Sequence, residues 1–262
     1  LSVVLADRIG GQTLGWVVGL VVALQPELAL YSASSLREPL YGALVLSSLL
    51  ALTRERLAWA SLFAGLAFLT RMDAVLILGP VLAVHALGRP NRGLRLLKAL
   101  LPLFVLVACW SLYCWQMYET WQFWGHATAV NLETGGQDKT LLTGLGVVLG
   151  LLGQTLSSHV GWALVFGFPL GLMLVPWKGH SALRSVALAA VLLLGFWLGI
   201  GLSAQHAPTH NLYWKWLYGV LPPFILISVM GLAGLVPRLT RIGGKPALVA
   251  GLCLVMGQGA WA

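Results

Sequence analysis

The sequence predicts an all-α protein, a polytopic transmembrane helix bundle of about eight to ten spans. The composition supports this prediction first. The 262 residues are 58% hydrophobic and 9% charged, whereas a soluble domain carries about 25% charged residues. The net charge is +8, but most basic residues stand in short loops between apolar runs, where positive charge sets the topology of membrane proteins. This placement argues against nucleic acid as a partner.

The apolar runs provide the second observation, because a spanning helix needs about 20 apolar residues. After a stub that ends before Asp7, the runs cover residues 13–30, 39–52, 57–69, 74–88, 99–117, 160–176, 185–203, 214–235 and 247–262. A basic elbow joins the short runs 39–52 and 57–69, which must therefore be antiparallel. Each covers only about 21 Å of a hydrocarbon layer of roughly 30 Å, so these two runs either extend into their flanks or form a re-entrant hairpin.

The loops between these runs alternate in charge, which is the third observation. One set of loops holds Arg8, Arg54, Arg56, Arg89, Arg92, Arg95 and Lys98. The positive-inside rule predicts that this set is cytoplasmic and that the other loops are extracytoplasmic. The rule also holds for Lys178 and Arg184 if residues 141–155 form an interfacial or re-entrant helix instead of a span. The chain is thus predicted to be a single transmembrane domain, 1–262, with an extracytoplasmic insertion at 118–159.

Four charged residues are predicted to gather on the extracytoplasmic side. Arg37 and Glu38 precede the run 39–52, and Arg71 and Asp73 follow the antiparallel run 57–69. Placing such a charge in an apolar bundle costs roughly 2.5 to 3.5 kcal/mol, so intramembrane charges usually mark a polar cavity or a substrate path. We therefore expect a substrate-binding site formed by these four residues.

Glu38, Arg71 and Lys215 each have a structural interpretation as well as a functional one. Glu38 can form a salt bridge with Arg37 or Arg71, or it can position a sugar hydroxyl or help to hold a cation. Arg71 can reach the interface, or it can bind a phosphate. Lys215, between Trp214 and Trp216, is either a snorkelling lysine or a cation that binds an anionic oxygen at a cavity mouth.

The predicted outer loop at 204–211 adds His210 to the substrate-binding candidates. His206 and His210 have the spacing of a helical metal pair, but Pro208 lies between them and no carboxylate stands nearby in the sequence. The sequence therefore predicts no metal site. Aromatic residues of the insertion, among them Trp121 and Trp124, suit either an anchoring belt at the membrane interface or a groove for an isoprenoid tail or a sugar ring.

Three motifs follow one another along the chain, namely SSLREPLYGAL at 34–44, GLAFLTRMDAVLILGP at 65–80 and LYGVLPPFILI at 217–227. Their order resembles the C-type (GT-C) membrane glycosyltransferases, in particular the dolichyl-phosphate-mannose protein mannosyltransferase-like branch, glycosyltransferase family 39, and its bacterial relatives. Arg37 stands where the family usually has Ser before the acid. Lys215 and Trp216 stand near its usual Arg-Tyr element.

The resemblance implies transfer of a sugar from a polyprenyl-phosphate donor to a protein, lipid or glycan acceptor, normally with inversion. It implies phosphate contacts from Arg71 and Lys215, and a role for Glu38 in organising the cavity. The family's general-base carboxylate lies in the first outer loop, so we expect the N-terminal helices and that loop to precede Leu1. No cofactor is firmly implied, although the resemblance leaves a divalent metal ion open.

Two other functions remain open from the sequence. A transporter or flippase for a lipid-linked or small polar substrate could use the same outer cavity, although no internal repeat of the kind typical of transporters is present. A structural subunit of a membrane complex would need only the aromatic belt. In each case we expect an integral protein of a bacterial or archaeal cytoplasmic membrane, with its site on the extracytoplasmic face.

Overall fold

A computed structural model describes residues 1–23, 37–88, 90–118, 161–174, 181–203 and 221–240. Every regular element of these segments is an α-helix, which confirms the all-α prediction for the described part of the chain. The helices are α1 (Ser2–Gly10), α2 (Gln12–Ala23), α4 (Arg37–Thr53), α5 (Leu57–Thr70), α6 (Ala74–Leu87), α7 (Arg92–Tyr118), α10 (Gly161–Leu174), α11 (Ser181–Ser203) and α13 (Leu221–Thr240). The predicted interfacial helix at 141–155 and the last apolar run lie outside the described residues.

The helices α4, α5 and α6 agree with the predicted apolar runs, whereas α7 begins earlier than expected. We predicted a span at 99–117 that follows a basic loop, but α7 already begins at Arg92. Arg92, Arg95 and Lys98 therefore lie in its first two turns. Arginine, leucine and lysine all have high helix propensity, so this basic stretch continues the helix instead of ending it.

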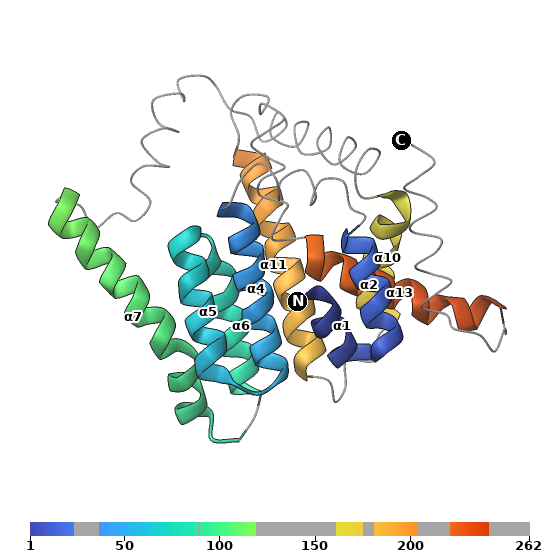
Figure 1. Ribbon diagram of the computed structural model, residues 1–262, viewed down its shortest axis with the longest axis horizontal. Coiled ribbons are helices and arrows are strands. Elements are labelled where there is room, and N and C mark those ends of the chain that lie inside the picture. The colour runs from blue at the N-terminus through green and yellow to red at the C-terminus, as the bar shows by residue number, and fades with distance from the viewer. Residues whose placement is uncertain (24–36, 89, 119–160, 175–180, 204–220, 241–262) are drawn as a thin grey trace.

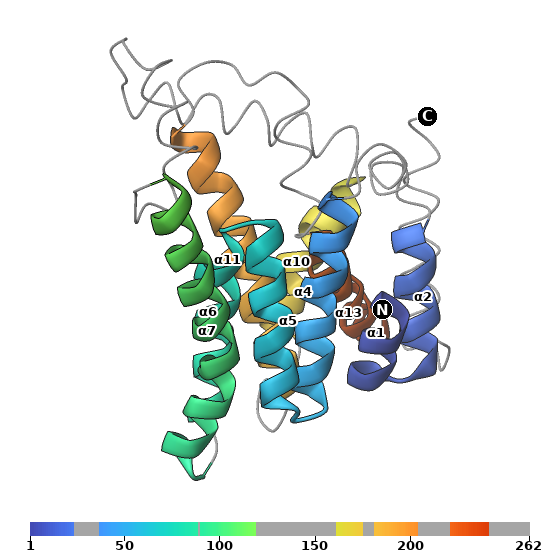
Figure 2. The ribbon, with the colours of Figure 1, turned by 60° about the vertical axis from the view of Figure 1, so that its left-hand side comes forward.

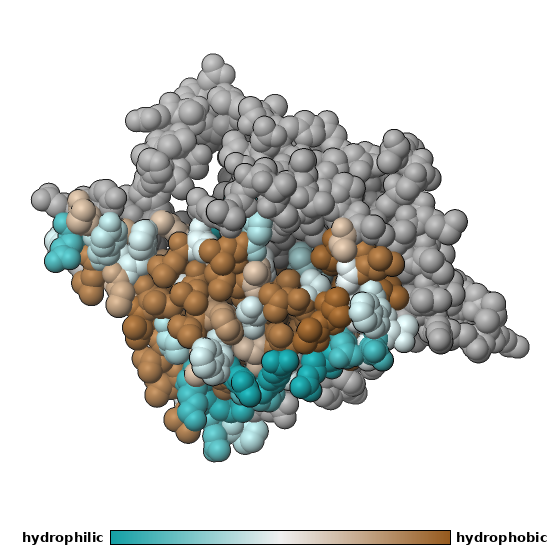
Figure 3. Space-filling model, in the orientation of Figure 1, coloured by the Kyte–Doolittle hydropathy of each residue, from teal (hydrophilic) through white to brown (hydrophobic). Residues whose placement is uncertain are grey.

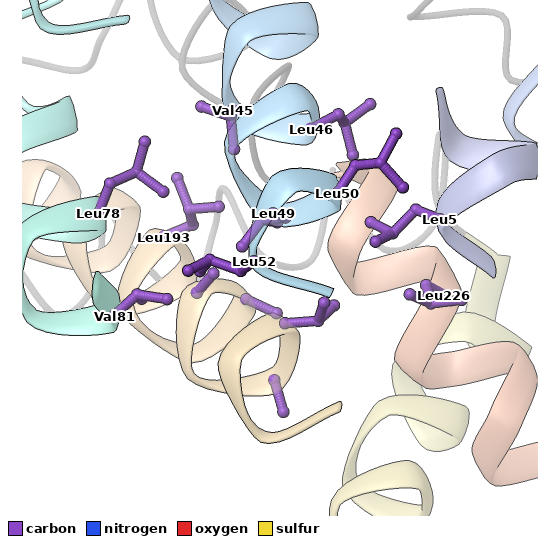
Figure 4. Packing of buried hydrophobic residues seen from close by; sticks show 14 of the residues in the cluster. Leu5, Val45, Leu46, Leu49, Leu50, Leu52, Leu78, Val81, Leu193 and Leu226 are labelled. Carbon is purple, nitrogen blue, oxygen red and sulfur yellow. The ribbon is translucent and has the colours of Figure 1, made fainter. Parts of the chain in front are cut away.

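Helix α4 is central in the described fold (Figure 1). It packs against α5 and α6, which follow it in the chain, and also against α1 and α11. Figure 2 shows α4, α5, α6 and α7 side by side, with the hairpin of α1 and α2 beside α4. In Figure 4, Leu49 and Leu52 of α4 lie toward α6 and α11, while Leu46 and Leu50 lie toward α1 and α13. One helix thus joins two halves of the core.

Small and hydroxyl side chains let neighbouring helices approach α5 closely. Ala60, Ala64 and Ala67 of α5 are fully buried. Ser48 of α4 donates a hydrogen bond to the Ala60 carbonyl at 2.8 Å, and the Leu103 backbone N–H of α7 donates to Ser61 Oγ at 3.0 Å. Small residues and hydroxyl hydrogen bonds between helices are typical of helix packing in membranes.

The close approach of helices α10 and α13 depends on glycines. A Cβ atom at Gly231 would lie 2.2 Å from the backbone N of Gly171 and 2.3 Å from the carbonyl oxygen of Gly167. The backbones are therefore in direct contact at this crossing. Gly167 and Gly171 have the spacing of the small-residue motif that permits such contact between membrane helices.

The surface of the described helices is largely apolar. One helix of the described segments, Arg92–Met117, is long and apolar enough to cross a membrane by length and composition, and six further apolar helices are shorter. Large exposed side chains include Leu101, Phe104 and Leu112 on α7. Figure 3 shows this hydrophobic surface above a hydrophilic band at the lower edge of the described atoms. The number of spans stays a prediction.

The contact between α10 and α13 predicts a sharp effect of a single methyl group. Gly231→Ala should lower the free energy of unfolding by about 1 to 3 kcal/mol, because the added Cβ must push two backbones apart. The midpoint of thermal unfolding in detergent measures this change. Gly195→Ala on α11 is the matched control, since a Cβ there meets no described atom within 4 Å. Equal midpoints for the two variants would contradict the close crossing.

Candidate functional site

The turn between α5 and α6 brings Arg71 and Asp73 together. Helix α5 ends at Thr70, and Arg71 leaves the helical conformation with φ −151° and ψ 121°. Its backbone N–H still donates to the Ala67 carbonyl at 2.8 Å. Asp73 then stands at the N-terminus of α6 with φ −62° and ψ −21°. The chain thus reverses within three residues, so both side chains lie at the same end of the helices.

Arg71 and Asp73 form a two-pronged ion pair. The Nε of Arg71 donates to Oδ1 of Asp73 at 3.0 Å, and its Nη2 donates to Oδ2 at 3.2 Å. Both residues are buried, with exposed fractions of 5% and 6%. Charge-assisted bonds of this kind fix the plane of the guanidinium as well as its position.

Tyr41 joins this pair from helix α4. Its hydroxyl donates to Oδ2 of Asp73 at 3.2 Å, and its ring lies under the Arg71 guanidinium, 4.8 Å from Cζ to the ring centroid. A cation above an aromatic face gains about 2 kcal/mol when the site is desolvated. Tyr41 is itself almost fully buried. It therefore links the first turns of α4 to the turn between α5 and α6.

Glu38 lies one helical turn before Tyr41, on the same face of α4, and is also buried. We call Glu38, Tyr41, Arg71 and Asp73 the α4–α6 cluster. The two carboxylates stand at the N-termini of α4 and α6, where the helix dipole stabilises negative charge. Asp73 does not cap α6 with its side chain. Its carboxylate oxygens accept hydrogen bonds from Arg71 and Tyr41 instead.

Of the six predicted substrate-binding residues, the structure pairs Arg71 with Asp73 and buries Glu38 one helical turn from Tyr41. Arg37 begins α4, but its side chain lies outside the described residues, as do Lys215 and His210. Tyr41 was not among the residues predicted from the sequence. Its spacing of three residues from Glu38, in an otherwise apolar stretch of α4, was the signal that could have identified it.

A second polar cluster lies at the opposite end of α4 and was not predicted. Glu55, in the turn between α4 and α5, binds Arg95 of α7 through Oε2, and its Oε1 lies 3.3 Å from Nε2 of His85. The other ring nitrogen of His85 lies 2.8 Å from Oγ of Ser185 on α11. Three helices and the turn between α4 and α5 meet in this cluster. The structure buries His85 in the last turn of α6.

Neither cluster has the composition of a metal centre. Within the described segments, no group of three or more His, Cys, Asp or Glu side chains is arranged to hold a metal ion. Asp73 of the α4–α6 cluster binds an arginine and a tyrosine. This donor set suits an organic ligand with hydroxyl or anionic oxygen atoms better than a bare cation.

Protein-family models, curated proteins and solved structures were compared with this chain, and none of them matches it. Assignment of a function therefore depends on the geometry of the described residues and on the sequence motifs.

The ion pair predicts a large cost for removal of one partner. Asp73→Asn should lower the free energy of unfolding by about 3 to 5 kcal/mol, because the buried Arg71 guanidinium would lose the carboxylate that its Nε and Nη2 groups bind. Thermal unfolding in detergent measures the loss. Asp7→Asn, at an exposed aspartate of α1, is the matched control and should change little. The double variant Arg71→Met/Asp73→Leu should recover most of the loss. A double variant as unstable as Asp73→Asn would contradict the pairing.

Proposed function

We propose that this protein is a membrane glycosyltransferase that moves a sugar from a polyprenyl-phosphate donor to an acceptor on the extracytoplasmic face. The observation that supports this proposal is the α4–α6 cluster. It gathers two carboxylates, a guanidinium and a phenol at one end of an apolar helix bundle. Intramembrane ionisable groups are costly and usually functional.

The packing of the helices supports a membrane location. Helix α7 has the length and composition of a span and leaves most of its apolar side chains exposed. A monomeric soluble protein rarely exposes so large an apolar surface. Serine hydroxyls and close glycine contacts join the helices, as expected where lipid replaces water around them.

The cluster suits the two parts of the proposed donor. Asp73 and Tyr41 hold the Arg71 guanidinium in one orientation, so that it can meet the donor phosphate without reorganising. Glu38 lies on the same face of α4 as Tyr41, and we assign it the hydrogen bond to a sugar hydroxyl. We assign Lys215 as a second phosphate contact and His210 as a further substrate contact.

The proposed reaction is an inverting displacement at the anomeric carbon. A hydroxyl of the acceptor attacks this carbon on the face opposite the phosphate, and a carboxylate acting as general base accepts its proton. The bond from the anomeric carbon to the phosphate oxygen breaks, and its electron pair leaves with the polyprenyl phosphate. Arg71 and Lys215 stabilise the negative charge that develops on that phosphate.

Loss of the Arg71 guanidinium tests the proposed donor contact. In the intact protein, Arg71→Ala should weaken binding of polyprenyl phosphate at least about tenfold, because the anion loses a charge-assisted partner. Arg71→Lys keeps the charge and should lose less. Equilibrium binding measures both, and transfer from radiolabelled polyprenyl-phosphate-mannose measures activity.

Arg92→Ala is the matched control for this test, because Arg92 is an exposed arginine at the far end of the bundle. It should bind polyprenyl phosphate as the unchanged protein does. The thermal midpoint of Arg71→Lys shows whether the cluster is still folded. Unchanged lipid-phosphate affinity in a folded Arg71 variant would refute the role of Arg71.

A further inference from the structure

Two hollows adjoin the turn between α4 and α5, at the end of the bundle opposite the α4–α6 cluster. The larger, of about 550 Å³, lies between this turn and the start of α7. Its charged lining residues are Glu55, Arg56, Arg95 and Lys98. The neighbouring hollow, of about 480 Å³, shares Glu55 and Arg56 and adds Arg8 and Arg54. Five cations and one carboxylate therefore line the two hollows.

The single carboxylate is already engaged. Glu55 binds Arg95 through one oxygen and lies beside His85 with the other. Arg56 and Lys98 have no carboxylate within ion-pair distance in the described part of the chain. Both are exposed to the exterior of the protein. The hollow thus has an excess of positive charge that an anionic ligand would balance.

The backbone around the larger hollow is unusual on both sides. Glu55 has φ 56° and Asn91 has φ 58°, the two non-glycine residues in the left-handed region within the described segments. The N–H of Arg56 bonds the Ala51 carbonyl, and the N–H of Glu55 bonds the Leu52 carbonyl, which is the pattern of a Schellman helix end. Glycine normally takes the position of Glu55. A strained residue persists there because Arg95 and His85 hold its carboxylate, and such strain clusters at binding sites.

Apart from Asn91, the rest of the lining of this hollow is apolar. Leu57, Ala58, Trp59, Pro90 and Leu94 contribute to its lining. Trp59 and Leu94 are 54% and 58% exposed, so they lie at the boundary between the hollow and the apolar outer surface. Tryptophan is enriched at the level of the lipid headgroups. Cations on one side and exposed apolar groups on the other suit a ligand that has both an anionic head and an apolar tail.

We propose that this hollow binds an anionic phospholipid, with its phosphodiester between Arg56 and Lys98 and an acyl chain along Trp59 and Leu94. The proposal rests on the membrane location given above and adds a site separate from the proposed transferase chemistry. Basic hollows between membrane helices on the cytoplasmic side are suited to anionic headgroups. The positive-inside rule predicts that Arg56 and Lys98 lie on the cytoplasmic side.

Native mass spectrometry of the intact protein in detergent tests the site. Phosphatidylglycerol should bind at least about tenfold more tightly than phosphatidylcholine, since each nearby Lys or Arg contributes to the attraction. Arg56→Gln/Lys98→Gln should remove this preference. Arg92→Gln/Arg184→Gln removes the same charge from exposed residues that do not line the hollows, and it should keep the preference. Equal losses in the two double variants would show diffuse electrostatics and overturn the site.

Three further measurements test the source of the ligand, the role of Trp59 and the membrane location. Glycerol phosphate at millimolar concentration should not displace the lipid, and full displacement would show a site for soluble phosphate instead. A brominated phosphatidylglycerol should quench less fluorescence in Trp59→Phe than in the unchanged protein, and equal quenching would remove Trp59 from the site. Release of the protein by alkaline carbonate would refute the membrane location. Retention without headgroup preference would refute this site alone.

Discussion

Burial of ionisable side chains in an apolar helix bundle is the constraint on which the rest of this structure depends. An uncompensated charge in such surroundings costs several kcal/mol, so each must have a partner in place. Arg71 meets this demand with Asp73 and the face of Tyr41. These contacts require α4 to lie against the turn between α5 and α6. The antiparallel packing of α4, α5 and α6 is therefore coupled to the electrostatics of a single cluster.

Charges at the two ends of α4 are stabilised in different ways. At its start, Glu38, Arg71 and Asp73 are buried, and Arg71 and Asp73 compensate each other. In the sequence, the formal charges of Arg37, Glu38, Arg71 and Asp73 sum to zero. At its end, cations outnumber carboxylates and remain exposed. A surface with unbalanced charge needs a solvent or ligand of high polarity, whereas a compensated cluster does not. This asymmetry agrees with an apolar layer that α4 crosses from a basic face to a charge-neutral one.

The sequence was sufficient to predict the coarse geometry but not the pairings. Two short apolar runs with a basic elbow required an antiparallel hairpin, and this placed Glu38 and Arg71 at the same end. The choice of Asp73 as the partner of Arg71 depends on the extended backbone of Arg71, which no residue pattern reveals. Glu55 in a left-handed conformation was equally hidden, because glycine is expected at such a helix end. His85 became significant only through tertiary contacts with two other helices.

The spacing of the two clusters along α4 connects the two proposed sites. From Glu38 to Arg54 the helix rises about 24 Å, which is less than the roughly 30 Å of a hydrocarbon layer. If anionic headgroups hold Arg56 and Lys98 at one interface, the α4–α6 cluster lies just below the opposite interface and not in bulk water. Charges at that depth must be enclosed by protein, as Tyr41 encloses the pair of Arg71 and Asp73. A lipid-linked donor, whose phosphate lies at the interface and whose tail lies in the membrane, would reach such a site from the side.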